Sequence, residues 1–146
     1  MVEIHSIRSF GRPEEYDAVY AIVRSLKRPI RDVEQLTTLS PEYSIFRRYL
    51  QLRDAGAWNA DSFAREYVPA FIRQIKNDPA ALAHLADISA RSAAGERIAL
   101  LCFCSDESLC HRSIIAGILR GAYGCDVRTE RALDYTLYAR YFQTLL

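Results

Sequence analysis

One short stretch holds most of the residues that could do chemistry. It is Cys110-His111-Arg112-Ser113, which follows an apolar run over residues 97–104 and a polar loop. The run predicts a buried strand, and the tetrapeptide is expected to open a helix. In open α/β sheets, ligands bind where strands end and helices begin, because free backbone N–H groups and the helix dipole attract anions there. The stretch therefore predicts an anion site.

Each residue of the tetrapeptide has an expected role. Cys110 is the candidate nucleophile, because a helix start and a neighbouring arginine lower a thiol pKa and raise the thiolate fraction. His111 is the candidate general acid or base. Arg112 would hold the anion through its guanidinium, and Ser113 would cap the helix or donate to the same anion. The alternative is structural: Cys110 packs as a small apolar residue, and His111 bonds a carbonyl.

A metal site is a weaker interpretation of the same region. Cys102 and Cys104 are two residues apart and would project from one strand face, so that Cys110 and His111 could complete a Cys3His zinc set. Structural zinc sites usually show paired Cys-x2-Cys spacings, which are missing here. The apolar flanks indicate that the strand cysteines belong to the core. The sequence therefore predicts no metal and no cofactor.

The strands that must position this site follow from short apolar patterns. Alternation predicts a first strand over residues 2–7, and the unbroken run at 97–104 is typical of a strand covered on both faces of a parallel sheet. Further short strands are expected at 30–33 and 126–129. Between the strands expected at 2–7 and 30–33, the apolar residues from Tyr16 to Leu26 follow a helical period after Pro13, which predicts a helix there.

Helices are expected through the middle of the chain and at its end. The middle section predicts three, one capped by Ser40 with Pro41 at its first position, one capped by Asp61, and one after Pro79. The tail carries an apolar stripe that predicts a C-terminal amphipathic helix, with Leu133, Leu137, Tyr138, Tyr141 and Phe142. The expected fold is one α/β domain over residues 1–146, with a small, mostly parallel sheet flanked by helices, a helical middle insertion and this C-terminal helix.

Charge and composition exclude several classes of protein. The formal net charge is +1, although 17 of the 19 cationic side chains are arginine, so a broad nucleic-acid-binding surface is not indicated. The hydrophobic share of 50% argues against disorder. No apolar run is long enough to span a membrane, and the start lacks the pattern of a signal peptide. Four clustered cysteines favour free thiols and a cytoplasmic location.

Aromatic residues and arginines alternate between residues 43 and 73. Such a segment can bind bases and phosphates, as in proteins that stack nucleic-acid bases on aromatic rings. The more common alternative is a set of amphipathic helices with buried aromatic side chains and solvated arginines.

The segment 100–119 resembles the family known as domain of unknown function 488. Members carry a Leu-Leu-Cys strand, an acidic loop and a Cys-His-Arg triplet that opens a helix, represented here by Leu100-Leu101-Cys102, Asp106-Glu107 and Cys110-His111-Arg112. A weaker similarity lies at 39–43 and 58–67, where small members have a Leu-Ala-Pro element and an aromatic-rich region. Larger members have a Gly-His-Ser element in the first strand. The resemblance therefore adds His5 and Ser6 as ligand-binding candidates, and it implies an α/β fold with a site at the triplet but no settled reaction.

Three functional hypotheses follow. The first is an enzyme acting on a phosphorylated, nucleotide or nucleobase substrate, with Arg112 holding the anion and Cys110 or His111 doing the chemistry. The second is a non-catalytic module that binds a small anionic or nucleotide-like ligand. The third is an interaction protein, with the C-terminal helix forming a homodimer face. None of the three requires a membrane.

Overall fold

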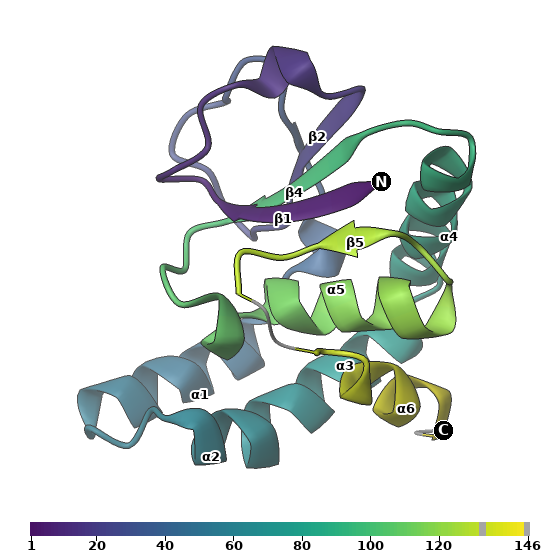
Figure 1. Cartoon of the computed structure of the whole chain (residues 1–146). Helices are drawn as coiled ribbons and strands as arrows, with labels where there is room; N and C mark the ends of the chain where they lie inside the picture. Colours follow the sequence, from purple (N-terminus) through teal and green to yellow (C-terminus); the bar gives the residue numbers. More distant parts are fainter. Residues whose placement is uncertain (132–133, 145–146) are drawn as a thin grey trace.

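Five parallel strands form one sheet in the order β3-β2-β4-β1-β5. They are β1 (Val2–Ser6), β2 (Ala18–Ala21), β3 (Glu34–Gln35), β4 (Ile98–Cys102) and β5 (Val127–Arg128). The computed structural model describes residues 1–131 and 134–144 (Figure 1). β4 lies in the centre of the sheet, and Ser6 pairs with Cys102 where β1 and β4 end. The predicted parallel sheet is thereby confirmed.

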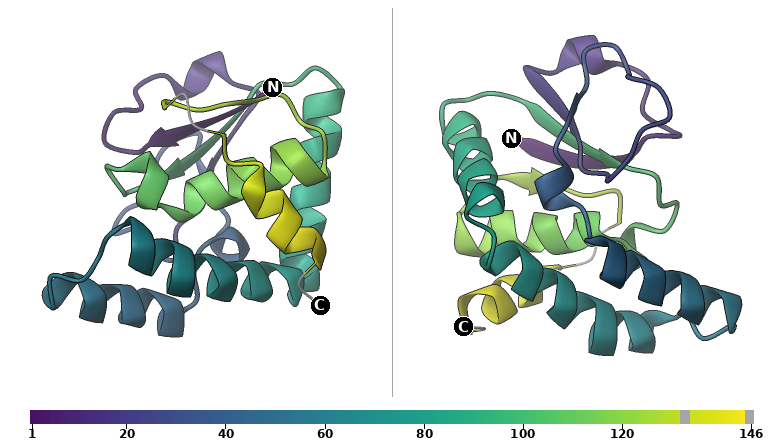
Figure 2. Two further views of the ribbon diagram at one scale, coloured as in Figure 1. Left: turned by 60° about the horizontal axis from the view of Figure 1, so that its bottom comes forward. Right: turned by 180° about the vertical axis from the view of Figure 1, so that it is seen from behind.

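The two faces of the sheet are covered differently. All helices longer than one turn lie on one side of the sheet in the described chain, and loops lie on the other (Figures 1 and 2). Every residue of β4 is buried, as the unbroken apolar run predicts. Ile98, Leu100 and Cys102 join the main core on the helix side, whereas Ala99 and Leu101 join a small second cluster on the loop side.

The predicted helix over Tyr16 to Leu26 is wrong. The chain makes a short 3-10 turn at Pro13–Glu15, becomes β2, and then runs as a loop to β3. The apolar positions of this segment fit a helical period, but the consecutive buried residues Val19, Tyr20 and Ala21 are those of a strand with both faces covered. The strand expected at 30–33 lies slightly later in the chain, as β3.

The helical middle insertion is confirmed, with different caps. It contains α1 (Tyr43–Asp54), α2 (Ala60–Ser62), a π-helical turn (Phe63–Tyr67), α3 (Val68–Lys76) and α4 (Pro79–Ala93). Ser40 does not cap α1. It ends a 3-10 turn at Thr37–Leu39, where its hydroxyl donates to the Thr37 carbonyl at 2.6 Å.

The next helix start also differs from the prediction. Asn59, not Asp61, caps α2. Its side-chain oxygen accepts from the Ser62 N–H, and its own backbone N–H donates to the Ser62 hydroxyl oxygen. The π-helical turn ends two residues before Pro69. Proline lacks an N–H and clashes with the preceding turn of a regular helix, which accounts for the wider turn.

Two more helices complete the fold, α5 (His111–Ala122) and α6 (Leu137–Thr144). α6 packs closely on α5 at two glycines. A Cβ at Gly117 would lie 2.0 Å from the Tyr135 carbonyl oxygen, and one at Gly121 would lie 2.5 Å from the Ala139 Cβ. The predicted C-terminal helix is present, although Leu133 lies outside the described residues. No helix in the described part of the chain is long and apolar enough to cross a membrane.

Candidate functional site

The predicted strand, loop and helix meet at the carboxyl edge of the sheet. β4 ends at Cys102, a 3-10 turn follows at Glu107–Leu109, and α5 begins at His111 directly after Cys110. The side chain of Cys110 makes no capping bond to the helix backbone, so its sulfur is available for other contacts. Ser113 donates from its hydroxyl to the Cys110 carbonyl at 2.8 Å, which gives it a helix-stabilising role rather than an exposed one.

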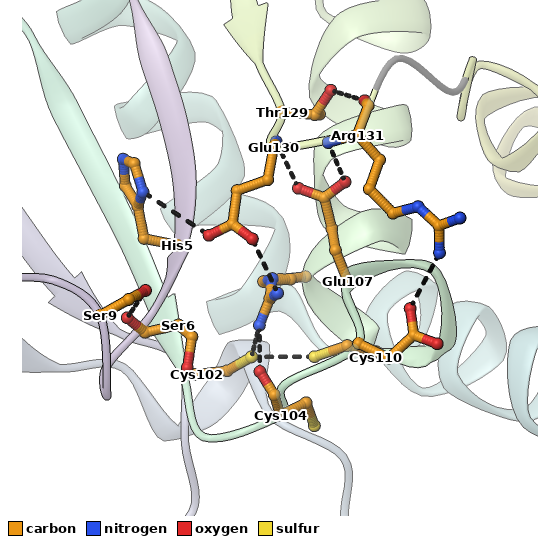
Figure 3. A network of polar contacts seen from close by, with 12 residues as sticks. His5, Ser6, Ser9, Cys102, Cys104, Glu107, Cys110, Thr129, Glu130 and Arg131 are labelled. Carbon is orange, nitrogen blue, oxygen red and sulfur yellow. Dashed lines mark hydrogen bonds and ion pairs between the residues drawn. The ribbon is translucent and has the colours of Figure 1, made fainter.

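Three cysteine sulfurs gather at this edge. The Sγ atoms of Cys102, Cys104 and Cys110 all lie within 4.8 Å of one another, and those of Cys102 and Cys110 are 2.8 Å apart (Figure 3). Cys102 and Cys110 are buried, whereas Cys104 is exposed. Cys104 was predicted to lie on the strand, but β4 ends at Cys102, two residues before it. The turn after the strand brings its thiol back toward the other two, and this group is called the thiol cluster below.

Arg112 lies beneath the thiol cluster and not in an open cradle. Its side chain is fully buried, and Nη1 donates to the Cys104 carbonyl oxygen at 2.6 Å and to Cys102 Sγ at 3.1 Å. Nη2 lies 3.8 Å from a carboxylate oxygen of Glu130 (Figure 3). Among the described residues, no acceptor lies within hydrogen-bond distance of Nε or Nη2. The Arg112 guanidinium, which was expected to bind an external anion, thus donates a hydrogen bond to a cysteine sulfur of its own chain.

The thiol whose pKa is lowered is that of Cys102, and not that of the predicted Cys110. Complete burial, together with hydrogen bonds to the other two sulfurs, raises the pKa of Cys110 well above its ordinary value. Hydrogen bonds from Cys104 and Cys110, with the nearby charge of Arg112, lower the pKa of Cys102. The expectation of an activated Cys110 thiolate is therefore corrected, and the burial of Cys110 is the main reason.

His111 is held in one orientation as a neutral ring. Its Nε2 lies 2.6 Å from the Ile22 carbonyl oxygen, and since a carbonyl only accepts, Nε2 carries the proton. Burial lowers the pKa of His111, which favours the neutral form. Nδ1 is then a bare acceptor, and it lies 3.7 Å from Cys110 Sγ. The carbonyl-bonded alternative for His111 is correct for one nitrogen, and the other nitrogen faces the thiol cluster.

Glu107 is a part of the site that sequence reasoning did not single out. Its carboxylate is buried and accepts from the backbone N–H groups of Glu130 and Arg131, at 2.8 and 3.1 Å (Figure 3). It also accepts from the Tyr135 hydroxyl at 2.7 Å. These bonds tie the segment after β5 across the start of α5. A carboxylate in the acidic loop beside the triplet was the available signal, but its partners lie far along the chain.

His5 and Ser6 end up near the site but not together in it. Ser6 is on the helix side of β1, where its Oγ accepts from the Arg8 N–H at 3.3 Å. His5 is on the loop side, packed against Phe10, and its Nδ1 lies 3.9 Å from Glu130 Oε1 (Figure 3). Because Glu130 also faces Arg112, His5 reaches the triplet only through that carboxylate.

An aromatic cavity opens beside the thiol cluster. Its volume is about 370 Å³, and its wall contains Cys104 and His111. Aromatic side chains from α1, the turn before α2, the π-helical turn and the loop after β4 make up much of the lining, namely Tyr43, Phe46, Tyr49, Trp58, Tyr67 and Phe103. The rings pack edge to face, with the centroids of Tyr49 and Trp58 4.7 Å apart. We refer to this space as the aromatic cavity.

The middle segment therefore fits neither of its two predicted descriptions completely. Its aromatic side chains line the aromatic cavity, while its arginines point to solvent, where Arg48 pairs with Glu66 at 3.0 Å. A larger, polar cavity of about 780 Å³ lies next to the aromatic one, and Arg24 lines both. The larger cavity contains none of the thiols, so the smaller one is the better candidate for chemistry.

Comparison with known families agrees with this arrangement. A family model described as "Active DUF488-N3 subclade" matches residues 5–122, which is most of the chain. The chain belongs to the DUF488 family. The DUF488 match includes the end of β1, the helical insertion, the thiol cluster and all of α5. Neither the curated proteins nor the solved structures contain a match to this DUF488 chain.

Proposed function

We propose that this DUF488 protein binds a flat nucleobase or nucleotide-like molecule in the aromatic cavity and acts on it at the wall that holds Cys104 and His111. The observation that carries the proposal is the placement of a thiol and an oriented imidazole on the wall of an aromatic-lined cavity. A volume of about 370 Å³ is in the range of small-molecule sites. Aromatic rings offer stacking surfaces to every base.

The rim of the cavity supplies a positive charge for a phosphate. Arg24 lines both the aromatic and the polar cavity, and its Nε donates to the Pro41 carbonyl at 2.9 Å, which fixes the side chain. Arg73 lines the polar cavity as well. A base in the aromatic cavity would thus leave its phosphate near Arg24. This assigns the anion to Arg24, in place of the buried Arg112.

Catalysis is the favoured version of the proposal. The word "Active" in the description of the matching subclade supports it, as does the presence of a thiol and a neutral histidine on one wall of the cavity. The alternative is a module that binds the same ligand without chemistry. Cys104→Ser separates them: an enzyme loses product formation while retaining binding, whereas a binding module shows no product with either protein.

Binding can be measured through the only tryptophan. Trp58 lies in the cavity wall, so its fluorescence reports directly on occupancy. We expect nucleoside monophosphates to quench it more strongly than inorganic phosphate, and Phe46→Ala to weaken binding about tenfold through lost stacking. Arg24→Gln should weaken monophosphates more than free bases. Arg48→Gln, an exposed arginine outside the cavity, is the matched control. The proposal would be refuted if none of the four common nucleoside monophosphates, and none of their free bases, quenched the Trp58 fluorescence.

A homodimer through α6 is a second proposal. Leu137 and Tyr141 are 53% and 44% exposed on this helix, which is unusual for large apolar side chains in two successive turns. Light scattering after gel filtration tests it, with Leu137→Ser expected to shift a dimer to monomer. A wild-type monomer at high concentration would refute the dimer. We also propose a reducing, cytoplasmic location, which suits the four free cysteines.

A further inference from the structure

The thiol cluster has the composition and spacing of a metal site. A zinc ion with zinc–sulfur bonds of about 2.3 Å holds its thiolates roughly 3.8 Å apart in a tetrahedron. The three sulfurs here all lie within 4.8 Å of one another, so that small side-chain rotations bring them to that spacing. The closest pair, Cys102 and Cys110, would separate by about 1 Å from its present 2.8 Å.

The surroundings of the cluster are those of a ligand set. His111 donates its Nε2 proton to the Ile22 carbonyl and presents a bare Nδ1 to Cys110. Histidines that bind metals are typically fixed in this way by a carbonyl on the opposite nitrogen. The Nδ1–Sγ distance of 3.7 Å is close to the nitrogen–sulfur separation in a tetrahedral zinc site, roughly 3.6 Å. His111 faces Cys110 rather than all three sulfurs.

The charges around the cluster also balance with a metal. Three thiolates in a buried pocket repel one another and are costly without cations. A divalent ion together with the single charge of Arg112, whose Nη1 lies 3.1 Å from Cys102 Sγ, neutralises them. Soft thiolate ligands select zinc-like ions over magnesium or calcium.

We propose that Cys102, Cys104 and Cys110 bind one zinc-type ion as thiolates, with His111 Nδ1 as the neighbouring nitrogen. The exposed Cys104 provides the entry route, since it reaches both the other two sulfurs and the aromatic cavity. With the ion bound, the three sulfurs are ligands and not nucleophiles, so the thiol chemistry proposed at Cys104 belongs to the metal-free protein. The inference is independent of the proposed cavity ligand, because the metal alone is the probe.

Cobalt(II) uptake by the full chain tests the site. The reduced protein, prepared metal-free, is titrated with Co²⁺ and followed by absorption. We expect a sulfur-to-cobalt charge-transfer band in the near ultraviolet that saturates at one equivalent and disappears when Zn²⁺ is added. Native mass spectrometry of the zinc form should show one retained ion. Zinc should also raise the midpoint of thermal unfolding, as any ligand of the folded state does.

Matched variants show where the ion binds. Cys104→Ser removes an exposed ligand without disturbing the core, so it should fold normally and weaken Co²⁺ binding at least a hundredfold. Cys125→Ser is the control, because this buried cysteine lies beyond the opposite end of α5. It should bind as the wild type does. A wild-type protein without the charge-transfer band, or Cys104→Ser with unchanged uptake, would overturn the proposal. Nucleotide quenching of Trp58 is measured separately and can fail while the metal site stands.

Discussion

Arg112 donates from Nη1 to the sulfur of Cys102, across a distance of 3.1 Å. The two residues come from the start of α5 and the end of β4, and both are fully buried. The same nitrogen donates to the Cys104 carbonyl, so one guanidinium fixes the end of the strand, the following loop and the helix start. The triplet that sequence analysis read as an anion cradle is, in the folded chain, a clamp on the strand that precedes it.

Removing this guanidinium should destabilise the protein. Arg112→Met keeps much of the side-chain volume but leaves the Cys104 carbonyl and the Cys102 sulfur without their donor. We expect the free energy of unfolding to fall by about 2–4 kcal/mol, as for other broken buried charge contacts, measured by urea denaturation. Arg128→Met, at an exposed position of β5, is the control and should change stability by less than about 0.5 kcal/mol. Equal effects of the two changes would contradict the clamp.

Glu107 should be as important as the triplet itself. Glu107→Ala leaves two backbone N–H groups and the Tyr135 hydroxyl without their acceptor, at a cost of about 2–4 kcal/mol. Hydrogen exchange should accelerate at the amides of Glu130 and Arg131. The neighbouring Asp106→Asn is the control, since Asp106 is exposed and its amide replacement can still accept from the Ser108 N–H. Unchanged exchange at both amides would show that Glu107 does not hold this segment.

The contact between α5 and α6 sets a steric limit at Gly117. Gly117→Ala places a Cβ 2.0 Å from the Tyr135 carbonyl oxygen, and backbone cannot move aside cheaply. We expect a loss of about 1–3 kcal/mol in thermal or urea unfolding, despite the better helix propensity of alanine. Gly11→Ala, where the added Cβ meets nothing within 4 Å, should be nearly neutral. A more stable Gly117→Ala protein would mean that the segment leading into α6 does not pack here.

The ion pair that Glu3 of β1 makes with Arg97 should make the stability of the fold depend on pH in the acid range. Glu3 pairs with Arg97 at 3.0 Å. Burial acts to raise the pKa of Glu3, but hydrogen bonds with Tyr16 and Arg97 and the charge of Arg97 outweigh it and hold the pKa below its ordinary value. A lowered folded pKa means that the pair stabilises the fold fully above the unfolded value near 4.5, and that this effect is lost as the pH falls through the lower pKa of the folded state.

Glu3→Gln should therefore cost about 1 kcal/mol at pH 7 and almost nothing at pH 3. Urea unfolding of the wild type and the variant across this range measures the difference. Glu15→Gln serves for comparison, because the Glu15–Arg12 pair is exposed and should contribute little at either pH. A difference between wild type and Glu3→Gln that does not change with pH would exclude the ionic explanation.

The strand-to-helix crossing could be predicted because its signals are local. An unbroken apolar run, a polar turn and a helix with period 3.6 are read within a few residues, and they correctly placed β4 and the start of α5. The helix predicted from Tyr16 to Leu26 failed because consecutive apolar residues also suit a strand that is covered on both faces. Only the position of β2 beside β4 decides between the two, and that pairing joins residues far apart in sequence.

The residues that make up the site were harder to predict from the sequence than its position in the chain. The triplet was found, but the cavity depends on Arg24, Trp58 and Cys104, which come from three separate segments. Cys104 was assigned to the strand because it is two residues from Cys102, a spacing that places two side chains on one strand face. This prediction failed because β4 ends at Cys102. Glu107 carries no special local pattern, and its partners arrive from beyond β5. Residues such as these acquire their roles from tertiary contacts alone.

The uneven covering of the sheet has a consequence for where the molecule opens. The helix side is covered by the large core. On the loop side, the buried apolar cluster of the described residues consists of Val19, Ala99 and Leu101, beneath residues such as Phe10 and Tyr16. Loops with few apolar contacts open at lower free energy than packed helices. We therefore expect local breathing, and with it protease cleavage, to begin between β1 and β2. The helix side, and the start of α5 within it, would stay closed while this happens.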